Sequence, residues 1–258
     1  MASTYWLKQS TEPLFPELIW SRPEHKASAG KLLIIGGNSM AVGAPATAYN
    51  ESLKAGAGSV RVLLPDTVKK AVGPILRDGE FTPSTPSGSF SQKSLADWLD
   101  HSQWADGVLI AGDLGRNSET AIVQEKFVDK YNGQLTVTQD AVDYFINLSP
   151  IISNRPKTSL VLSFAQLQKL AQTLGFSTPF TFSMDLIRLV ESLHEFTSIY
   201  PVLLVTKHLD QIIITHEGLV STTHNGEKIW RVETAAHASV WWLQNPTKPF
   251  EASTTAVF

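Results

Sequence analysis

Short, wholly apolar runs that end in glycine turns are the feature that most constrains this chain. Leu32-Leu33-Ile34-Ile35 leads into Gly36-Gly37-Asn38, and the run at 107–111 leads into the turn at 112–115. Such runs suit the centre of a parallel sheet whose two faces are both covered. Helical patterns alternate with them at 44–56, 119–131, 164–175 and 184–196. This alternation predicts an α/β fold, with a mostly parallel central sheet and helices on both faces.

The two ends of the chain and one internal stretch lack this alternation. Residues 1–24 hold three prolines and the aromatics Trp6, Phe15 and Trp20, which predict an irregular arm that packs on the body. Residues 25–258 are expected to form a single domain. The Ser/Thr/Pro/Gly-rich stretch 78–93 predicts a long loop. Ser183 is expected to cap the helix that follows it.

Composition limits the classes of partner. The 258 residues carry a formal net charge of −3, so no broad attraction to nucleic acid or to an anionic membrane is expected. The chain has no cysteine, which removes disulfides and thiolate chemistry. No apolar run approaches the roughly 20 residues of a membrane span, and the first residues lack the pattern of a secretory signal. We therefore expect a cytoplasmic protein.

The glycine turns can be compared with three known phosphate or nucleophile motifs. A dinucleotide-binding dehydrogenase needs G-x-G-x-x-G, whereas Gly36-Gly37 is followed by glycine only at Gly43, although Asp66 does follow the next strand. No P-loop sequence and no G-x-S-x-G nucleophile turn occurs. The turns remain candidates for anion binding, because parallel sheets bind ligands beyond the carboxyl ends of their strands. The alternative is that these glycines only permit tight turns.

The segment from His25-Lys26 to Pro65 resembles the start of the ADP/ATP-dependent NAD(P)H-hydrate dehydratases, a branch of the ribokinase-like superfamily. The stretches "HKASAGKLLIIGGNS", "GAP" and "LKAGAGSVRVLLP" follow the order and spacing of that family. Later stretches, "DGVLIAGDLGRN", "LTVTQDAVDYF", "YPVLLVTKH" and "NPTKPFEASTTAVF", extend the resemblance over most of residues 25–258. It implies a ribokinase-like fold.

The resemblance also implies a reaction and a set of site residues. ATP or ADP with Mg²⁺ phosphorylates the hydroxyl of hydrated NADH or NADPH, and elimination of phosphate restores the dihydronicotinamide. The matched positions that would bind this substrate are Asn38, Gly43, Ala44, Asp113, Gly115 and Ser163. Lys207 and Val232 fall at nucleotide-binding positions, and Asp140 and Glu233 at catalytic ones. No metal site made of protein side chains alone is expected.

The catalytic half departs from the family pattern. Trp230-Arg231-Val232-Glu233 stands where the family has Gly-Thr-Gly-Asp at a helix start, whose amides hold the transferred phosphoryl group. Large side chains obstruct close approach of an anion to these amides. Glu233 could serve as a base, but its carboxylate lies one bond further out than aspartate, and a misplacement of about 1 Å can cost roughly 100-fold in rate. Ser163 replaces a histidine and Asp113 adds negative charge to a glycine turn.

Several residues also have ordinary structural explanations. Lys207 is either a phosphate contact or a solvated lysine, Asp140 either a catalytic carboxylate or a helix cap, and Glu233 either a base or a first-turn acid that the helix dipole favours. Trp241-Trp242 is expected to pack the last helix onto the body or onto a second copy, and such a homo-oligomer would cover apolar surface.

The first interpretation is a divergent NAD(P)H-hydrate dehydratase-like protein with a small-molecule nucleotide as its partner. A non-catalytic nucleotide-binding or interaction relative and a small-molecule kinase with an altered substrate remain as alternatives.

Overall fold

One sheet organises the chain. The computed structural model describes residues 4–148, 154–225 and 230–258, and in these ranges ten strands form a sheet in the order β1-β10-β9-β8-β7-β6-β5-β2-β3-β4. Seven neighbouring pairs of described strands are parallel, and β9 is antiparallel to both β8 and β10. The strands are β1 Trp6–Gln9, β2 Lys31–Gly36, β3 Ser59–Pro65, β4 Gly79–Thr82, β5 Gly107–Gly112, β6 Gln134–Thr138, β7 Thr158–Leu162, β8 Leu203–His208, β9 Gln211–His216 and β10 Leu219–His224.

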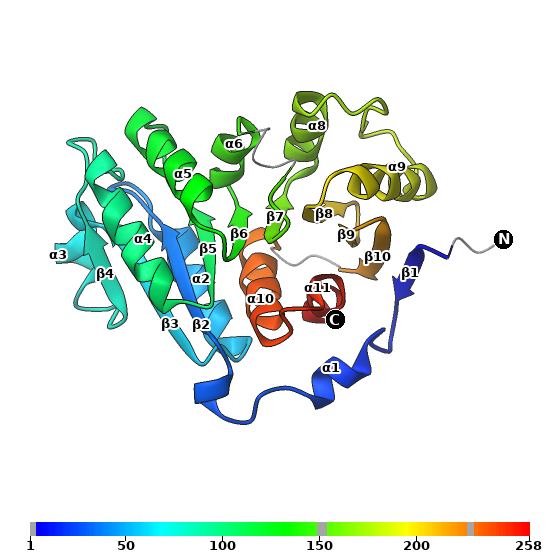
Figure 1. Ribbon diagram of the computed structural model, residues 1–258, viewed down its shortest axis with the longest axis horizontal. Coiled ribbons are helices and arrows are strands. Elements are labelled where there is room, and N and C mark those ends of the chain that lie inside the picture. The colour runs from blue at the N-terminus through cyan, green and yellow to red at the C-terminus, as the bar shows by residue number, and fades with distance from the viewer. Residues whose placement is uncertain (1–3, 149–153, 226–229) are drawn as a thin grey trace.

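Helices cover both faces of this sheet (Figure 1). The larger ones are α2 Gly43–Lys54, α4 Leu95–Trp104, α5 Ser118–Lys130, α6 Ala141–Ile146, α8 Phe164–Thr173, α9 Leu186–Ile199, α10 Arg231–Gln244 and α11 Pro249–Ala256. Short elements are α1 Pro16–Trp20, α3 Lys69–Val72 and the 3-10 turns η1 Lys26–Ser28, η2 Asp66–Val68 and η3 Gln92–Ser94. No helix among the described residues is long and apolar enough to cross a membrane.

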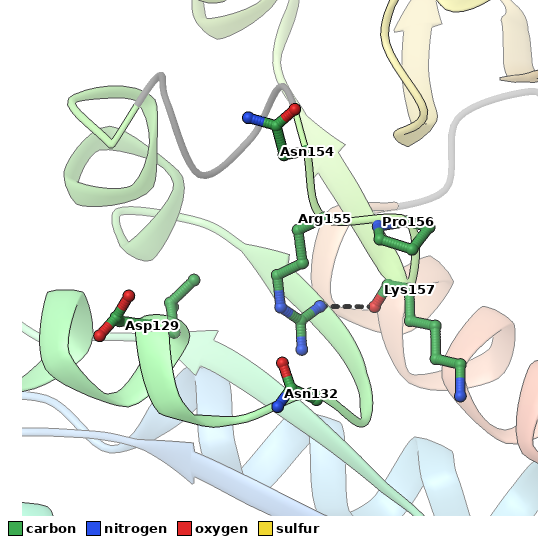
Figure 2. Close-up of a pocket in the computed structure, with 7 residues that line it drawn as sticks. Asp129, Asn132, Asn154, Arg155, Pro156 and Lys157 are labelled. Carbon is green, nitrogen blue, oxygen red and sulfur yellow. Dashed lines mark hydrogen bonds between the residues drawn. The ribbon is translucent and has the colours of Figure 1, made fainter.

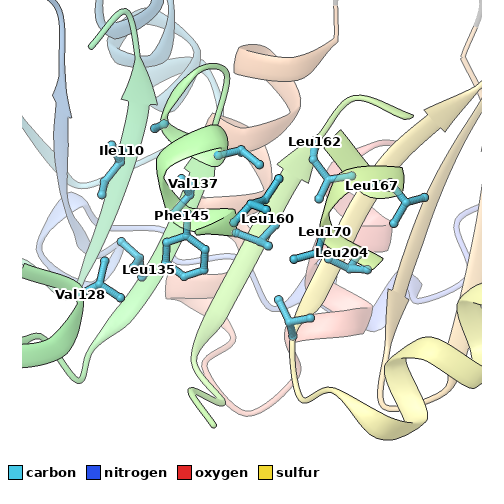
Figure 3. Packing of buried hydrophobic residues seen from close by; sticks show 14 of the residues in the cluster. Ile110, Val128, Leu135, Val137, Phe145, Leu160, Leu162, Leu167, Leu170 and Leu204 are labelled. Carbon is cyan, nitrogen blue, oxygen red and sulfur yellow. The ribbon is translucent and has the colours of Figure 1, made fainter. Parts of the chain in front are cut away.

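Strand β2 shows why its sequence is apolar throughout. Leu33 and Ile35 belong to the core cluster under α4, α5, α6, α8 and α9, whereas Leu32 and Ile34 belong to the cluster under α2 and α10. Successive side chains of a strand point to opposite faces, so a strand covered on both sides has no solvent face. Burying each of these side chains contributes roughly 1.5–3 kcal/mol. Figure 3 shows the first cluster, with side chains of β5, β6, β7 and β8 packed against their helices.

Three local expectations were wrong. The stretch 78–93 is not only a loop, because it contains strand β4 and a bridge between Ser84 and Phe90. Helix α9 begins at Leu186 and is capped by Asp185, which accepts a hydrogen bond from the amide of Arg188, and not by Ser183. The described part of the N-terminal arm, residues 4–24, is not irregular throughout, since it contains β1 and α1.

The N-terminal segment joins the body at two points. Strand β1 pairs in parallel with β10, so it forms one edge of the sheet. Helix α1 contacts α11, and its Leu18 is buried with Trp241 and Trp242 of α10. The two tryptophans therefore pack α10 against α1 and α11.

The carboxyl ends of the parallel strands β2, β5, β6, β7 and β8 meet at one edge of the sheet. Here the backbones of β2 and β5 approach so closely that a Cβ on Gly36 would lie 2.6 Å from the carbonyl oxygen of Gly112. Only glycine at position 36 permits this contact. The glycine turns after β2 and β5 are thereby brought side by side.

Candidate functional site

Two residues at this edge adopt a backbone conformation that side chains rarely take. Asp113, directly after β5, has φ 56°, and Gln139, directly after β6, has φ 57°. Left-handed non-glycine residues cost of order 1 kcal/mol or more and cluster at binding sites. Gly112 has φ 102° and lies against Gln139, with no room for a Cβ. The backbone conformations of the turns after β5 and β6 are therefore constrained by their contact with each other.

Asp113 connects the first glycine turn with the start of α2. Its Oδ2 accepts a hydrogen bond of 2.7 Å from the amide of Ala44, in the first turn of the helix. Its carbonyl oxygen accepts a 2.6 Å bond from Nδ2 of Asn38, whose Oδ1 in turn accepts bonds from the amides of Met40 and Ala41. A helix N-terminus is a natural site for an anion. In this chain the anion is the carboxylate of Asp113.

Asp140 makes the equivalent contact to the second glycine turn. Its Oδ2 accepts a 3.0 Å bond from the amide of Gly115. Asp140 stands at the N-cap position of α6, but its side chain makes no capping bond to that helix. Burial raises the pKa of Asp140, the bonds from the amides of Leu114 and Gly115 oppose this, and the charge of Asp113 adds to it. Its Oδ1 is buried without a hydrogen-bond partner among the described residues.

A cavity of about 610 Å³ opens beside Asp140 and Gly115. Its lining residues include amide and hydroxyl side chains, two cations, Arg116 and Lys169, and two carboxylates, Asp140 and Asp143. Tyr144, another lining residue, donates from its hydroxyl to the carbonyl of Gly115 and accepts a 2.9 Å bond from the amide of Asn117. Volumes of roughly 300–1,000 Å³ are usual for small-molecule sites. The cavity is large enough for a nucleotide.

Ser163 is not among the residues that line this cavity, and it is the N-cap residue of α8. It caps α8 in a capping box with Gln166, in which Ser163 Oγ accepts a 3.2 Å bond from the amide of Gln166. The Gln166 amide group then donates to the carbonyl of Gln139 and to Oδ2 of Asp143. The cap therefore ties α8 to the left-handed turn after β6.

The start of α10 is separate from this network. Trp230 is its N-cap residue, and the side chain of Val232 is buried in the core cluster that contains Ala44. Glu233 lines a cavity of about 230 Å³ together with Glu51 and His237. His237 Nε2 lies 3.1 Å from Glu51 Oε2. This space is smaller than usual ligand sites and holds two carboxylates.

The predicted site residues thus fall into two groups. Hydrogen bonds join Asn38 and Ala44 to Asp113, and a separate one joins Gly115 to Asp140. Gly115 lies against Asn38, Gly43 lies near Asp113, and Ser163 is linked to this edge only through Gln166. Val232 and Glu233 lie at α10, and Lys207 is half-buried on β8, where it pairs in register with Ile212 of β9. Val232 of the second group shares a buried core cluster with Ala44 of the first. In the described residues no group of three or more metal-ligating side chains is placed to hold a metal ion.

Sequence reasoning missed three residues of this network: Gln139, Asp143 and Tyr144. The first stands in a left-handed turn, a conformation for which Asn or Gly would have been a stronger signal. The others act through contacts between helices α5, α6 and α8, which no local pattern reveals. The S-x-x-Q pattern at 163–166 is a capping-box signature and could have been found.

Comparisons with known proteins agree on the fold. No family model matches the chain. A segment of 97 residues, 38% of this chain, is 35% identical to the bifunctional NAD(P)H-hydrate repair enzyme Nnr of Methanothermobacter thermautotrophicus and spans 18% of that relative. The chain therefore matches less than a fifth of the length of this curated protein.

Solved structures resemble almost the whole chain. A ribokinase-like superfamily protein from Enterococcus faecalis superposes with a TM-score of 0.72 at 15% identity, covering 98% of this chain and 86% of that one. The ADP/ATP-dependent NAD(P)H-hydrate dehydratase of Bacillus subtilis, co-crystallized with ATP/Mg²⁺, gives a TM-score of 0.61 at 15% identity, covering 96% and 87%. The ribokinase-like fold that the sequence predicts is confirmed.

Proposed function

We propose that this chain is a divergent relative of the ADP/ATP-dependent NAD(P)H-hydrate dehydratases that binds a nucleotide at the carboxyl edge of its sheet and no longer transfers a phosphoryl group efficiently. The relationship is supported by the ribokinase-like fold and by the segment that is similar to a repair enzyme. Nucleotide binding is supported by the cavity of about 610 Å³, whose wall offers two cationic side chains and several amide and hydroxyl groups beside the carboxylates of Asp140 and Asp143.

One observation carries the loss of phosphoryl transfer. The amide of Ala44, in the first turn of α2, binds the carboxylate of Asp113, and the amide of Gly115, in the turn after β5, binds that of Asp140. Phosphoryl transfer depends on preorganised donors aimed at the charge that develops in the transition state. A phosphoryl group at this edge would have to displace a carboxylate from its amide and would then meet two negative charges. Both effects raise the barrier.

The start of α10 does not fit the phosphates of ATP or ADP either. The family arrangement needs small residues there, whereas Trp230 and Arg231 begin this helix. Glu233 faces a space of about 230 Å³ that it shares with Glu51, so the carboxylate expected to act as base lies next to another acid. We derive no catalytic step through this end. A small-molecule kinase with an altered substrate needs the same donors, and the same residues argue against it.

Nucleotide binding can be tested by calorimetry with ATP, ADP, AMP, NADH and hydrated NADH. We expect saturable binding of at least one of them, weakened in Lys169→Met, which removes a cation from the cavity wall. Lys126→Met is the matched control, because Lys126 is exposed on α5 and does not line the cavity. If no nucleotide binds, or if both variants weaken binding equally, the proposed binding site is wrong.

A further inference from the structure

A second cavity, of about 300 Å³, lies at the opposite edge of the sheet, where β6 and β7 begin (Figure 2). It is independent of the nucleotide site, because its walls come from the end of α5 and the segment that enters β7. Two neighbouring cationic residues, Arg155 and Lys157, line it together with the amide side chain of Asn132. Asp129 is the acidic residue of the wall.

Arg155 is a buried cation, with a relative exposure of 8%. Its guanidinium donates to the carbonyls of Lys157 at 2.7 Å, Tyr131 at 2.7 Å and Gly133 at 2.6 Å, and to the Thr158 hydroxyl at 2.8 Å. All four acceptors are uncharged. None of the ion pairs found in the described part of the chain includes Arg155. Burial lowers its pKa to about 10, which reflects the cost of keeping this charge away from water.

The end of α5 compensates part of this charge. Tyr131 is the C-cap residue of α5, and the carbonyl end of a helix carries about half a negative charge. This interaction explains why an arginine is tolerated here, as a clamp between two loops. It leaves a positive excess, to which Lys157 adds a full charge. In Figure 2 the carboxylate of Asp129 points away from the guanidinium.

We propose that this cavity binds an oxyanion of the phosphate class. Lys157 Nζ and the Asn132 amide supply the direct contacts, whereas Arg155 acts through its charge, because its N–H groups are already bound to the protein. A buried cation without an opposite charge is disfavoured even when it is hydrogen-bonded, so an anion bound in the cavity should also stabilise the folded chain. The volume admits a free phosphate ion or the phosphate end of a nucleoside monophosphate.

The test is a calorimetric titration of the full chain with inorganic phosphate, AMP and, as the uncharged comparison, adenosine. Saturable phosphate binding is expected, and Lys157→Met should lower its affinity about tenfold, the usual effect of losing a charge-assisted hydrogen bond. Asp129→Asn should raise the affinity several-fold. Binding of AMP with the same dependence on Lys157 would identify a phosphomonoester as ligand, and binding of phosphate alone a free ion.

Lys130→Met is the control for a diffuse positive field, since Lys130 is exposed at the end of α5 and does not line the cavity. It should leave phosphate affinity unchanged. The proposal fails if phosphate gives no saturable signal, or if Lys130→Met weakens binding as much as Lys157→Met. It also fails if Lys157→Met weakens the binding of adenosine as much as that of AMP. Circular dichroism establishes that each variant is folded.

Discussion

Replacing Asp113 by asparagine isolates the charge that occupies the start of α2. Asparagine keeps an oxygen that can accept the 2.7 Å bond from the amide of Ala44 and tolerates the φ of 56°. The stability cost is the lost interaction of a charge with the helix N-terminus, about 0.3–1 kcal/mol. Relief of the repulsion with Asp140, whose pKa the charge of Asp113 raises, offsets part of it. The free energy of unfolding of Asp113→Asn should therefore differ from that of the wild type by no more than about 1 kcal/mol.

The same substitution should strengthen binding of phosphate-bearing nucleotides. A unit negative charge about 5 Å from a phosphate costs about 1–3 kcal/mol at the effective dielectric of a protein surface. Its removal should raise affinity roughly 5- to 150-fold, and the gain should shrink as salt is added. Calorimetry at low and high salt measures both effects.

Asp100→Asn is the matched control, since Asp100 is exposed on α4 and its replacement changes the net charge by the same amount. If Asp113→Asn gives no gain in nucleotide affinity at low salt, or if Asp100→Asn gives an equal gain, the charge of Asp113 does not repel the bound phosphate.

Three further substitutions test the packing and burial of residues in the fold. Gly112→Ala should lower the free energy of unfolding by more than about 2 kcal/mol in urea titration, because its Cβ would lie 2.4 Å from that of Gln139 at a φ of 102°; an unchanged midpoint would count against this packing. Trp98→Ala, at a fully buried position, should cost about 3–5 kcal/mol, and a cost below about 1 kcal/mol would contradict its burial. Burial lowers the pKa of His216 below 6.5, so the stability that its neutral form contributes is complete above that pH and is lost as pH falls. His216→Gln should remove this dependence of the free energy of unfolding on pH. A variant that keeps the wild-type pH profile would argue against it.

Much of the fold follows from the sequence because buried strands and amphipathic helices leave strong periodic signals. Leu32–Ile35 could be recognised as a strand covered on both faces from its composition alone. Strand β4 could not, since Gly79–Thr82 lies among turn residues and becomes a strand only by pairing with β3. Strand β1 likewise exists because β10 offers it an edge. Pairing of this kind is a tertiary effect that local propensity does not contain.

The candidate site was predicted unevenly for a similar reason. Asn38, Asp113 and Asp140 were singled out as ligand-binding or catalytic residues, and those roles stay predictions. Their contacts suggest a different use, in which carboxylates replace the anion that the turns could hold. This exchange depends on φ at Asp113 and on the approach of β5 to β2, both of which are set by packing. Sequence shows which groups are present but not which of them bind each other.

We propose that this chain keeps a nucleotide site but lacks free backbone amide donors for phosphoryl transfer. The most direct test of this proposal is the recovery of NADH absorbance from hydrated NADH with ATP or ADP and Mg²⁺, measured at protein concentrations where nucleotide binding is saturated. We predict recovery no faster than in the protein-free blank. Recovery that is clearly faster, and that Glu233→Gln abolishes, would contradict the account and make the chain an active dehydratase.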